Sequence, residues 1–159
     1  METRVGIGFD IHPLAEGRPL MIGGIEIPYV KGLRGHSDGD VLIHAVCDAL
    51  LGAAGKGDIG EYFPDSDPAL EGVCSVRLLE KAVEAVGKGR YVVTNLDIVL
   101  IAAEPDFSPF KRSIRQKLSA VLGIAEDRVT VKAKTNNGLG ETGAGAAIAC
   151  HAAVALTKE

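Results

Sequence analysis

The 159-residue chain contains no tryptophan, and aromatic residues make up only 4% of it. It also lacks an excess of basic residues: the formal net charge is −4 at pH 7, and no basic stretch is interleaved with aromatic side chains. Nucleic-acid-binding surfaces need clustered positive charge, so we expect no nucleic-acid partner. No apolar run approaches the roughly 18 residues that a membrane span requires, so we expect no membrane partner.

Cysteine is scarce as well. Cys47, Cys74 and Cys150 lie far apart in apolar surroundings, form no Cys-x-x-Cys pair and leave one cysteine odd. This pattern favours reduced thiols in the core over a disulfide framework. The N-terminus carries no charged segment followed by an apolar one, the pattern of a secretory signal. Together these absences predict a cytoplasmic location.

What the chain does contain is typical of a globular enzyme. Its length predicts a single domain over residues 1–159. Apolar residues make up 47% and charged residues 24%, which is ordinary usage for a domain with one core. The 20 glycines gather in loops, where they suit a close approach of the backbone to phosphate groups.

Hydrophobic periodicity predicts the elements of the fold. Strands are expected over residues 3–9, 91–102 and 128–134, and a hairpin with a Gly-Gly turn over residues 20–27. Helices should begin near residues 40, 75 and 108 and end near residues 52–55, 87–89 and 123. This order predicts an α+β fold, a single-domain sandwich of a mixed β-sheet with helices on one face, plus a β-hairpin.

Two segments leave alternatives open. Residues 146–156 are rich in alanine, which favours a helix, yet apolar residues fall at even spacing, which favours a strand. Residues 57–72 form a long stretch without clear periodicity, which indicates either a functional or a mobile loop.

A polar loop leads into the expected helix at residue 40. Ser37 and Asp38 are N-cap residues by type, and Asp40 suits the positive end of a helix dipole. A helix start of this kind is an anion site, for phosphate above all. His44 then lies one or two turns inside the helix, at a half-buried edge. A histidine satisfied by a core neighbour is the alternative interpretation.

Alternation along the first strand places Asp10 and His12 on one face, at the end of the strand. With His44 they would provide one carboxylate and two imidazoles. Three protein ligands with an open fourth position are typical of catalytic zinc. The same ligand set occurs in non-haem iron oxygenases, and Asp-x-His on its own is a short and common pattern.

Four sequence blocks together resemble a known family. They are Gly8-Phe9-Asp10-Ile11-His12, then His36-Ser37-Asp38-Gly39-Asp40 with His44, then Gly57-Asp58-Ile59-Gly60, then Phe63-Pro64-Asp65-Ser66-Asp67. In this order they resemble the 2-C-methyl-D-erythritol 2,4-cyclodiphosphate synthase family, over essentially the whole chain. The resemblance also favours a strand over residues 146–156, and that is our prediction.

The resemblance implies a lyase of the non-mevalonate pathway of isoprenoid synthesis. Its substrate would be 4-diphosphocytidyl-2-C-methyl-D-erythritol 2-phosphate, converted to 2-C-methyl-D-erythritol 2,4-cyclodiphosphate with release of CMP. It further implies a homotrimer with active sites between subunits. One Zn²⁺ per subunit would be held by Asp10, His12 and His44, and Mg²⁺ or Mn²⁺ would bridge the diphosphate.

The resemblance also implies roles for individual residues. His36 and Thr135 would be catalytic, orienting or stabilising the transferring phosphates. Residues 58–60 and 63–67 would hold the methylerythritol portion, and residues 102–108 with Lys134 and Thr135 the cytidine. The complete substrate-binding set that it implies is Asp10, His12, His36, Ser37, Asp58, Ile59, Gly60, Phe63, Pro64, Asp65, Ser66, Asp67, Ala102, Ala103, Glu104, Pro105, Asp106, Phe107, Ser108, Lys134, Thr135, Asn136, Asn137 and Glu141.

The chain departs from the family pattern at a few positions. Asn137 stands where many members have a glutamate that binds magnesium, and a neutral carbonyl is a poorer ligand for a hard cation, so we expect weaker magnesium binding. Asp106 stands where a lysine is frequent, which removes a favourable charge beside the cytidine phosphates. Glu141 and Ala144 replace an aromatic residue and an arginine, so we expect no isoprenoid diphosphate in a central cavity.

Two other functions use parts of the same pattern. A non-haem iron oxygenase would use the three ligands, but such chains are usually β-rich jelly rolls. A nucleotide-binding module without catalysis would need the loops but no open metal position. Metal analysis separates them, since zinc favours the synthase, iron the oxygenase and no metal the binding module.

Overall fold

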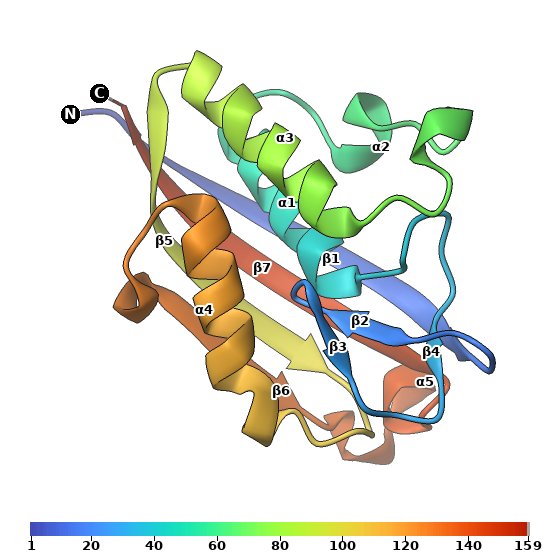
Figure 1. Cartoon of the computed structure of the whole chain (residues 1–159). Coiled ribbons are helices and arrows are strands. Elements are labelled where there is room, and N and C mark those ends of the chain that lie inside the picture. Colours follow the sequence, from blue (N-terminus) through green and yellow to red (C-terminus); the bar gives the residue numbers. More distant parts are fainter. Residues whose placement is uncertain (159) are drawn as a thin grey trace.

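The computed structural model describes residues 1–158 and shows a curved sheet with helices packed along it (Figure 1). The five-stranded sheet has the order β4-β1-β7-β5-β6, in which β5 and β6 run parallel and the other neighbours antiparallel. Its strands are β1 (Thr3–Ala15), β4 (Gly32–Leu33), β5 (Tyr91–Ile101), β6 (Val129–Lys134) and β7 (Ala147–Lys158). The predicted mixed sheet is thereby confirmed.

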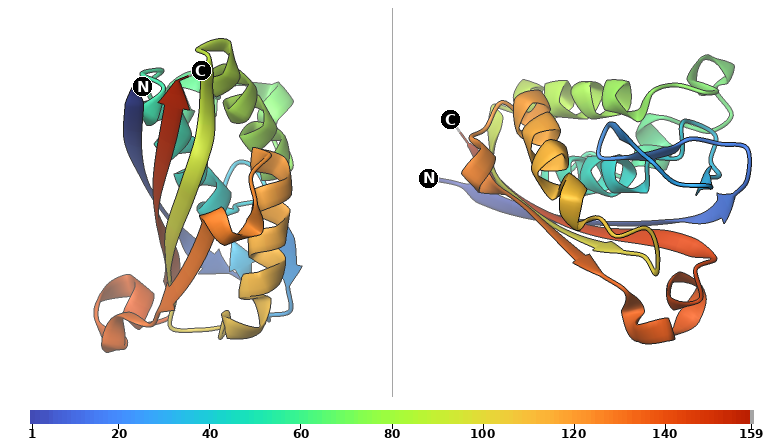
Figure 2. Two further views of the ribbon diagram at one scale, coloured as in Figure 1. Left: turned by 90° about the vertical axis from the view of Figure 1, so that its left-hand side faces the viewer. Right: turned by 60° about the horizontal axis from the view of Figure 1, so that its bottom comes forward.

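Three long helices, α1 (Val41–Ala53), α3 (Ser75–Lys88) and α4 (Lys111–Leu122), cover one face of this sheet (Figure 2). A separate hairpin pairs β2 (Leu20–Ile22) with β3 (Ile25–Ile27) through the expected Gly-Gly turn, and both glycines have positive φ. The predicted α+β fold with helices on one face and a hairpin is confirmed. None of the helices in residues 1–158 is both long and apolar enough to span a bilayer.

The first strand shows the alternation that the sequence predicts. Gly6, Gly8, Asp10 and His12 face α1, while the side chains between them point away from it. A Cβ atom on Gly8 would lie 1.8 Å from the carbonyl oxygen of Ala45, and one on Gly6 would clash with α1 in the same way. Because both positions are glycine, the helix backbone rests directly against the strand.

The last segment is a strand, as predicted. Ile148, Cys150, Val154 and Leu156 are all buried against the helical layer, and β7 pairs with β1 on one side and β5 on the other. The alanines between these positions let the central strand pack closely. Pairing with two neighbouring strands therefore makes this segment a strand, although its alanine content alone favours a helix.

Two predicted boundaries, the end of the first strand and the start of the third long helix, were wrong in detail. β1 runs to Ala15 and does not end at residue 9, so Asp10 and His12 lie within the strand. Pro13 is tolerated there because its neighbour Leu14 donates to Ala146, which leaves the Pro13 nitrogen on the side away from β7. A 3₁₀ turn, Ser108–Phe110, precedes α4, which itself ends as expected at a left-handed Gly123.

The long loop is more ordered than its composition suggests. It contains α2 (Ile59–Tyr62), capped by Asp58, and a 3₁₀ turn, Pro68–Leu70, capped by Asp67. Two further short elements follow β6, a 3₁₀ turn at Asn136–Gly138 and α5 (Gly140–Gly143). Aspartates at N-caps explain how such short turns persist without apolar periodicity.

The predicted core position of the cysteines holds for two of them. Cys47 and Cys150 are buried, whereas Cys74 is exposed immediately before α3. All three are free thiols. The interpretation of Cys74 as a core thiol was therefore wrong, because the segment before a helix lies at the surface.

Candidate metal centre and substrate cavities

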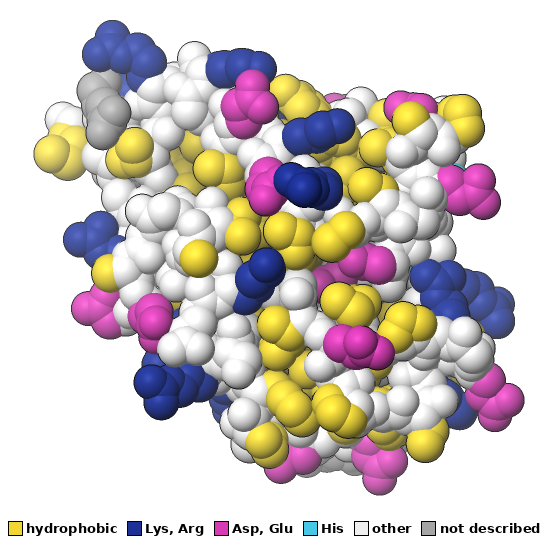
Figure 3. Space-filling model, viewed as in Figure 1, with side chains coloured by type: hydrophobic (Ala, Val, Ile, Leu, Met, Phe, Trp, Pro, Cys, Tyr) yellow, Lys and Arg dark blue, Asp and Glu magenta, His cyan; other side chains and the backbone are white. Residues whose placement is uncertain are grey.

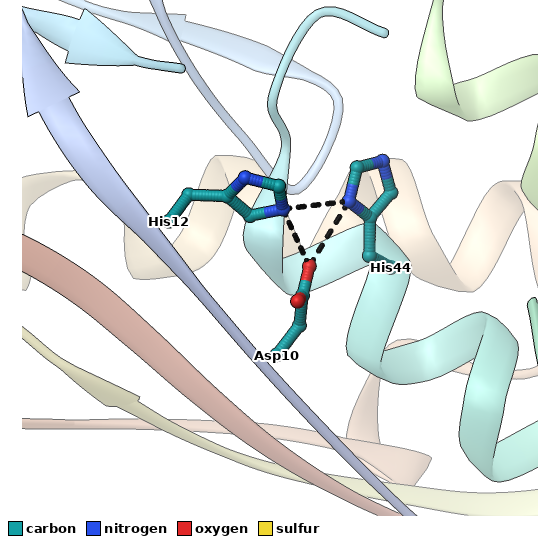
Figure 4. A group of neighbouring side chains, drawn as sticks. All are labelled: Asp10, His12 and His44. Carbon is teal, nitrogen blue, oxygen red and sulfur yellow. Dashed lines mark hydrogen bonds and ion pairs between the residues drawn. The ribbon is translucent and has the colours of Figure 1, made fainter. Parts of the chain in front are cut away.

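Asp10, His12 and His44 converge on one point between β1 and α1 (Figure 4). The Oδ2 atom of Asp10 lies 2.7 Å from Nε2 of His12 and 3.0 Å from Nδ1 of His44, and the two nitrogens are 3.2 Å apart. In a tetrahedral site with ligand bonds of about 2.0–2.1 Å, donor atoms are separated by roughly 3.3 Å. The donor set and its spacing fit a divalent metal of borderline softness, as the sequence predicts.

The other nitrogen of each imidazole has its own partner. Nδ1 of His12 lies 2.6 Å from the carbonyl oxygen of Arg34, so it donates its proton there and leaves Nε2 free for a cation. Nε2 of His44 lies 2.9 Å from the hydroxyl of Ser37 and 3.0 Å from that of Ser75. Such outer partners orient ligating histidines and are a general property of metal sites.

Hydrogen bonds within the cluster shift the pKa values of Asp10 and His12. Burial opposes ionisation of Asp10, but hydrogen bonds from His12 and His44 outweigh it and lower the pKa of Asp10 to about 2. Burial likewise disfavours the charged form of His12, yet the bond to Asp10 raises the pKa of His12 above its ordinary value. A divalent cation would compete with the proton on Nε2 of His12, since metal ligands must be deprotonated.

The start of α1 is organised differently from the prediction. Asp40, not Ser37 or Asp38, is the N-cap, and its carboxylate accepts hydrogen bonds from the backbone N–H groups of Gly23, Gly24 and Ile43. Asp40 is fully buried. The helix start is therefore filled by a carboxylate of the chain itself, and the expectation of a phosphate site at this point was wrong.

A cavity of about 190 Å³ opens beside the metal cluster. Its wall includes His36, whose Nε2 atom is buried and has no hydrogen-bond partner among the described residues. An orphaned polar atom of this kind is a ready partner for a polar ligand. The lining residues are Asp10, His12, His36, Ser37, His44, Ile59, Gly60, Phe63, Asp65, Leu70, Val73 and Leu78.

A second cavity, of about 600 Å³, lies where β5 and β6 end. It gathers every residue of the predicted cytidine pocket: Ala102, Ala103, Glu104, Pro105, Asp106, Phe107, Ser108, Lys134 and Thr135. Tyr29 and Ala133 complete the wall, and no described residue lines both this cavity and the one beside the metal cluster. Sequence reasoning missed Tyr29, whose segment has no marker of function beyond its place after the hairpin.

Some predicted substrate residues lie outside both cavities. Asp58 lines a third cavity, of about 640 Å³, between α1 and the strands β1, β5 and β7, together with Asp48, which accepts the N–H of Ile59. The structure therefore brings together most of the implied site in two groups. The predicted residues that line neither of the first two cavities are Asp58, Pro64, Ser66, Asp67, Asn136, Asn137 and Glu141.

Known proteins match the chain from end to end. The profile of the YgbB family matches residues 3–157. The 2-C-methyl-D-erythritol 2,4-cyclodiphosphate synthase of Gloeobacter violaceus is 52% identical over 157 residues, which are 99% of this chain and 96% of that protein. The enzyme of the same name from Desulfatibacillum aliphaticivorans is 48% identical over 153 residues, covering 96% of this chain and 99% of that protein.

Solved structures agree with these sequence matches. A 2C-methyl-D-erythritol-2,4-cyclodiphosphate synthase in its CDP-bound form superposes with a TM-score of 0.90 at 38% identity. The match covers 97% of this chain and all of that one. The mixed sheet with three covering helices is the architecture of these proteins and not a β-rich jelly roll, which removes the basis for an iron oxygenase of that kind.

Proposed function

Because the chain belongs to the YgbB family of 2-C-methyl-D-erythritol 2,4-cyclodiphosphate synthases, we propose that Asp10, His12 and His44 form the metal centre of that enzyme. The enzyme converts 4-diphosphocytidyl-2-C-methyl-D-erythritol 2-phosphate to the cyclic diphosphate. An oxygen of the 2-phosphate attacks the β-phosphorus, the bond from this phosphorus to the bridging oxygen of CMP breaks, and CMP leaves. The nucleophile belongs to the substrate, so the protein has to position and neutralise charge.

One observation carries the proposal: three metal-ligand side chains meet at the mouth of a cavity that also holds an unpartnered imidazole nitrogen. When bound, the metal would act as a Lewis acid that offsets charge on the β-phosphate. His36 would then donate a hydrogen bond from Nε2 to a phosphate oxygen. Ile59 and Phe63 would enclose the methylerythritol carbon skeleton and exclude water from it.

We assign the nucleotide end of the substrate to the cavity where β5 and β6 end. Lys134 would offset phosphate charge there, and the hydroxyl of Thr135 would orient the transferring phosphate. Residues 102–108 line this cavity, and their free backbone groups would read the cytosine edge. The substrate has two recognised ends, and each end has a separate cavity.

We propose that the two cavities of one site come from two subunits of a homotrimer. The face of the sheet away from the helices is uncovered (Figure 2), and along β1 it presents apolar side chains: Val5 is 71% and Ile7 81% exposed, and Phe9 and Ile11 are exposed as well. The helical side, by contrast, mixes acidic and basic side chains without a patch of one sign (Figure 3). A large apolar surface on an enzyme of this size is typical of an interface.

Mixing two inactive variants should restore activity if the sites are shared. We expect His44→Ala and Thr135→Ala proteins to be inactive alone, and to regain a fraction of wild-type turnover once their subunits exchange. Some mixed assemblies would then contain a site with both halves intact. CMP release measures turnover, and mass spectrometry measures exchange. Activity that stays at the level of the separate variants after proven exchange would exclude the shared arrangement.

The metal requirement tests the proposed centre directly. Protein stripped of metal should release no CMP from the diphosphocytidyl substrate in magnesium alone, because the charge on the β-phosphate is then not offset at Asp10, His12 and His44. Added zinc should restore turnover at one equivalent per chain. Restoration by ferrous iron and not by zinc, or full activity without either, would contradict the proposal of zinc.

Asn137 is the residue with which we propose to test the second metal, Mg²⁺ or Mn²⁺ on the diphosphate. Asn137→Glu should move half-activation to lower magnesium concentration, since a carboxylate is a better ligand for a hard cation. Asn137 has φ 53° and ψ 37°, a left-handed conformation that asparagine tolerates better than glutamate, so a stability loss of about 1 kcal/mol is expected alongside. Asn137→Gln is the control, because glutamine has the shape of glutamate without its charge. Superimposed magnesium titrations of the Glu and Gln variants would refute the idea.

We also propose a cytoplasmic location. Cys47, Cys74 and Cys150 are free thiols. Reducing compartments keep thiols in this form, whereas secreted domains generally use them in disulfides.

A further inference from the structure

The loop between β4 and α1 carries His36 to the cavity beside the metal cluster, although residues 34–40 form no helix or strand. Several carbonyl groups of this loop accept hydrogen bonds from other parts of the chain. The carbonyl oxygen of Arg34 accepts from Nδ1 of His12, and that of His36 accepts from the backbone N–H of Gly72 at 2.9 Å. The position of the His36 imidazole therefore depends on groups outside the loop.

Arg18 binds the two carbonyl groups on either side of His36. Its guanidinium donates from Nη2 to the carbonyl oxygen of Ser37 at 2.9 Å and from Nη1 to that of Gly35 at 3.3 Å. Both bonds are partly buried, and no carboxylate among residues 1–158 pairs with this guanidinium. The planar guanidinium holds its donors in fixed positions, so a single side chain sets the spacing of the two carbonyl groups.

The backbone of Arg18 is itself fixed against β4. A Cβ atom on Gly32 would lie 2.5 Å from the carbonyl oxygen of Arg18 and closer still to that of Pro19. Because residue 32 is glycine, β4 packs directly on the turn between β1 and β2. The guanidinium is therefore attached to a backbone with little room to move, and it joins this turn to the loop that carries His36.

We propose that Arg18 is a positioning residue for the reaction, which fixes the loop so that the His36 imidazole is held at the wall of the cavity, where it meets a phosphate oxygen. The inference rests on the role proposed above for His36. Arg18 lines neither substrate cavity, so it acts through His36 and not by touching the substrate. A displacement of about 1 Å in a positioned group can cost roughly 100-fold in rate.

Arg18→Ala removes both hydrogen bonds and should lower kcat about 10–100-fold, with KM changed less than about threefold. CMP release measures both constants. Arg18→Lys keeps the charge but offers one nitrogen in place of the planar group, so it should be impaired as well. Arg4→Ala is the matched control, because Arg4 is also a partly exposed arginine, bound to Glu2 near the other end of β1. It should retain the wild-type kcat.

Two further measurements test whether the effect passes through His36. In a double-mutant cycle, adding Arg18→Ala to His36→Ala should lower kcat less than about twofold further, because the group that Arg18 positions is already gone. Amide hydrogen exchange needs no turnover. It should become faster at Gly72 and Asp38 in Arg18→Ala, because the N–H of Gly72 bonds to the carbonyl oxygen of His36 and that of Asp38 bonds to Val73.

The outcomes separate the role of Arg18 from the proposed reaction. Unchanged amide exchange in Arg18→Ala, full turnover in Arg18→Lys or an additive effect in the double variant would each overturn the inference. Loss from Arg18→Ala of zinc that the wild type binds would also overturn it, since the effect would then pass through the metal ligands. If the wild type releases no CMP while Arg18→Ala speeds exchange at Gly72 and Asp38, the hold of Arg18 on the loop is confirmed and the proposed function is wrong.

Discussion

Replacing His44 by alanine should give a folded protein that carries no divalent metal and turns over at least about 10³-fold more slowly. The fold should survive because α1 is anchored by fully buried neighbours such as Leu42, Ile43 and Val46. The vacated space is bordered by Ser37 and Ser75, whose hydroxyls are 3.3 Å apart and can bond to each other. Elemental analysis measures the metal, CMP release the turnover, and circular dichroism the fold.

His151→Ala is the control for metal content. This histidine lies on the exposed side of β7, where its ring is tilted against that of Phe9, on the face of the sheet opposite to the cluster. It should retain metal at the wild-type level. Wild-type metal content in His44→Ala as well would show that the ligand set is wrongly assigned.

Asp40→Ala should lower the free energy of unfolding by roughly 3–5 kcal/mol. The carboxylate accepts three backbone N–H groups, two from the turn of the β2–β3 hairpin and one from the first turn of α1. Its removal leaves these buried donors without partners, at about 1–3 kcal/mol each before relaxation. Urea unfolding measures the loss, and a change below about 1 kcal/mol would mean that water or relaxation satisfies the donors.

The same residue predicts a pH dependence, tested with the isosteric Asp40→Asn. Burial raises the pKa of Asp40 to about 6, and the nearby Asp38 adds to the rise despite the three N–H donors. An acid with a folded-state pKa above its unfolded value of 3.8 binds its proton more tightly when folded. Its contribution to stability therefore increases as pH falls from 6 to 4, by at most about 3 kcal/mol.

Other ionisable groups change the stability with pH in the opposite direction. Only the difference in unfolding free energy between the wild type and Asp40→Asn is therefore informative. Asp10, with a pKa lowered to about 2, contributes stability that is lost as pH falls below its unfolded value. Asp10 is present in both proteins. The wild type should gain stability relative to Asp40→Asn between pH 6 and 4, and parallel curves of unfolding free energy against pH would contradict the assignment.

Much of the fold could be predicted from the sequence because it depends on local periodicity. The hairpin turn at Gly23 and Gly24, the helix end at Gly123 and the strand character of residues 146–156 are all confirmed. The errors lie where long-range pairing overrides local signals. The polar residues after residue 9 and Pro13 suggest a loop, but register with β7 keeps them in the strand.

The residues that would bind the metal could be predicted from the sequence, whereas the residues that hydrogen-bond around them could not. Asp-x-His on a strand and a histidine on an amphipathic helix already suggest a metal centre. Asp40 is an example. Its type and position suit a helix start that is open to a ligand, yet its carboxylate accepts a hydrogen bond from Gly24, in a hairpin turn 16 residues earlier. Ser75 is separated from His44 by 31 positions, and no spacing rule links the two.

The close contact between Gly8 and Ala45 has a consequence for the binding equilibrium of the metal. Gly8 precedes Asp10 by two residues, and Ala45 directly follows His44, so the point where helix and strand backbones touch sets the span between the two halves of the cluster. Ligands held in this way lose little conformational freedom when an ion binds, because most of their conformational entropy is lost when the chain folds. A methyl group on Gly8 would widen that span even if the protein still folded, and we expect it to slow ion capture and speed ion release without altering any ligand.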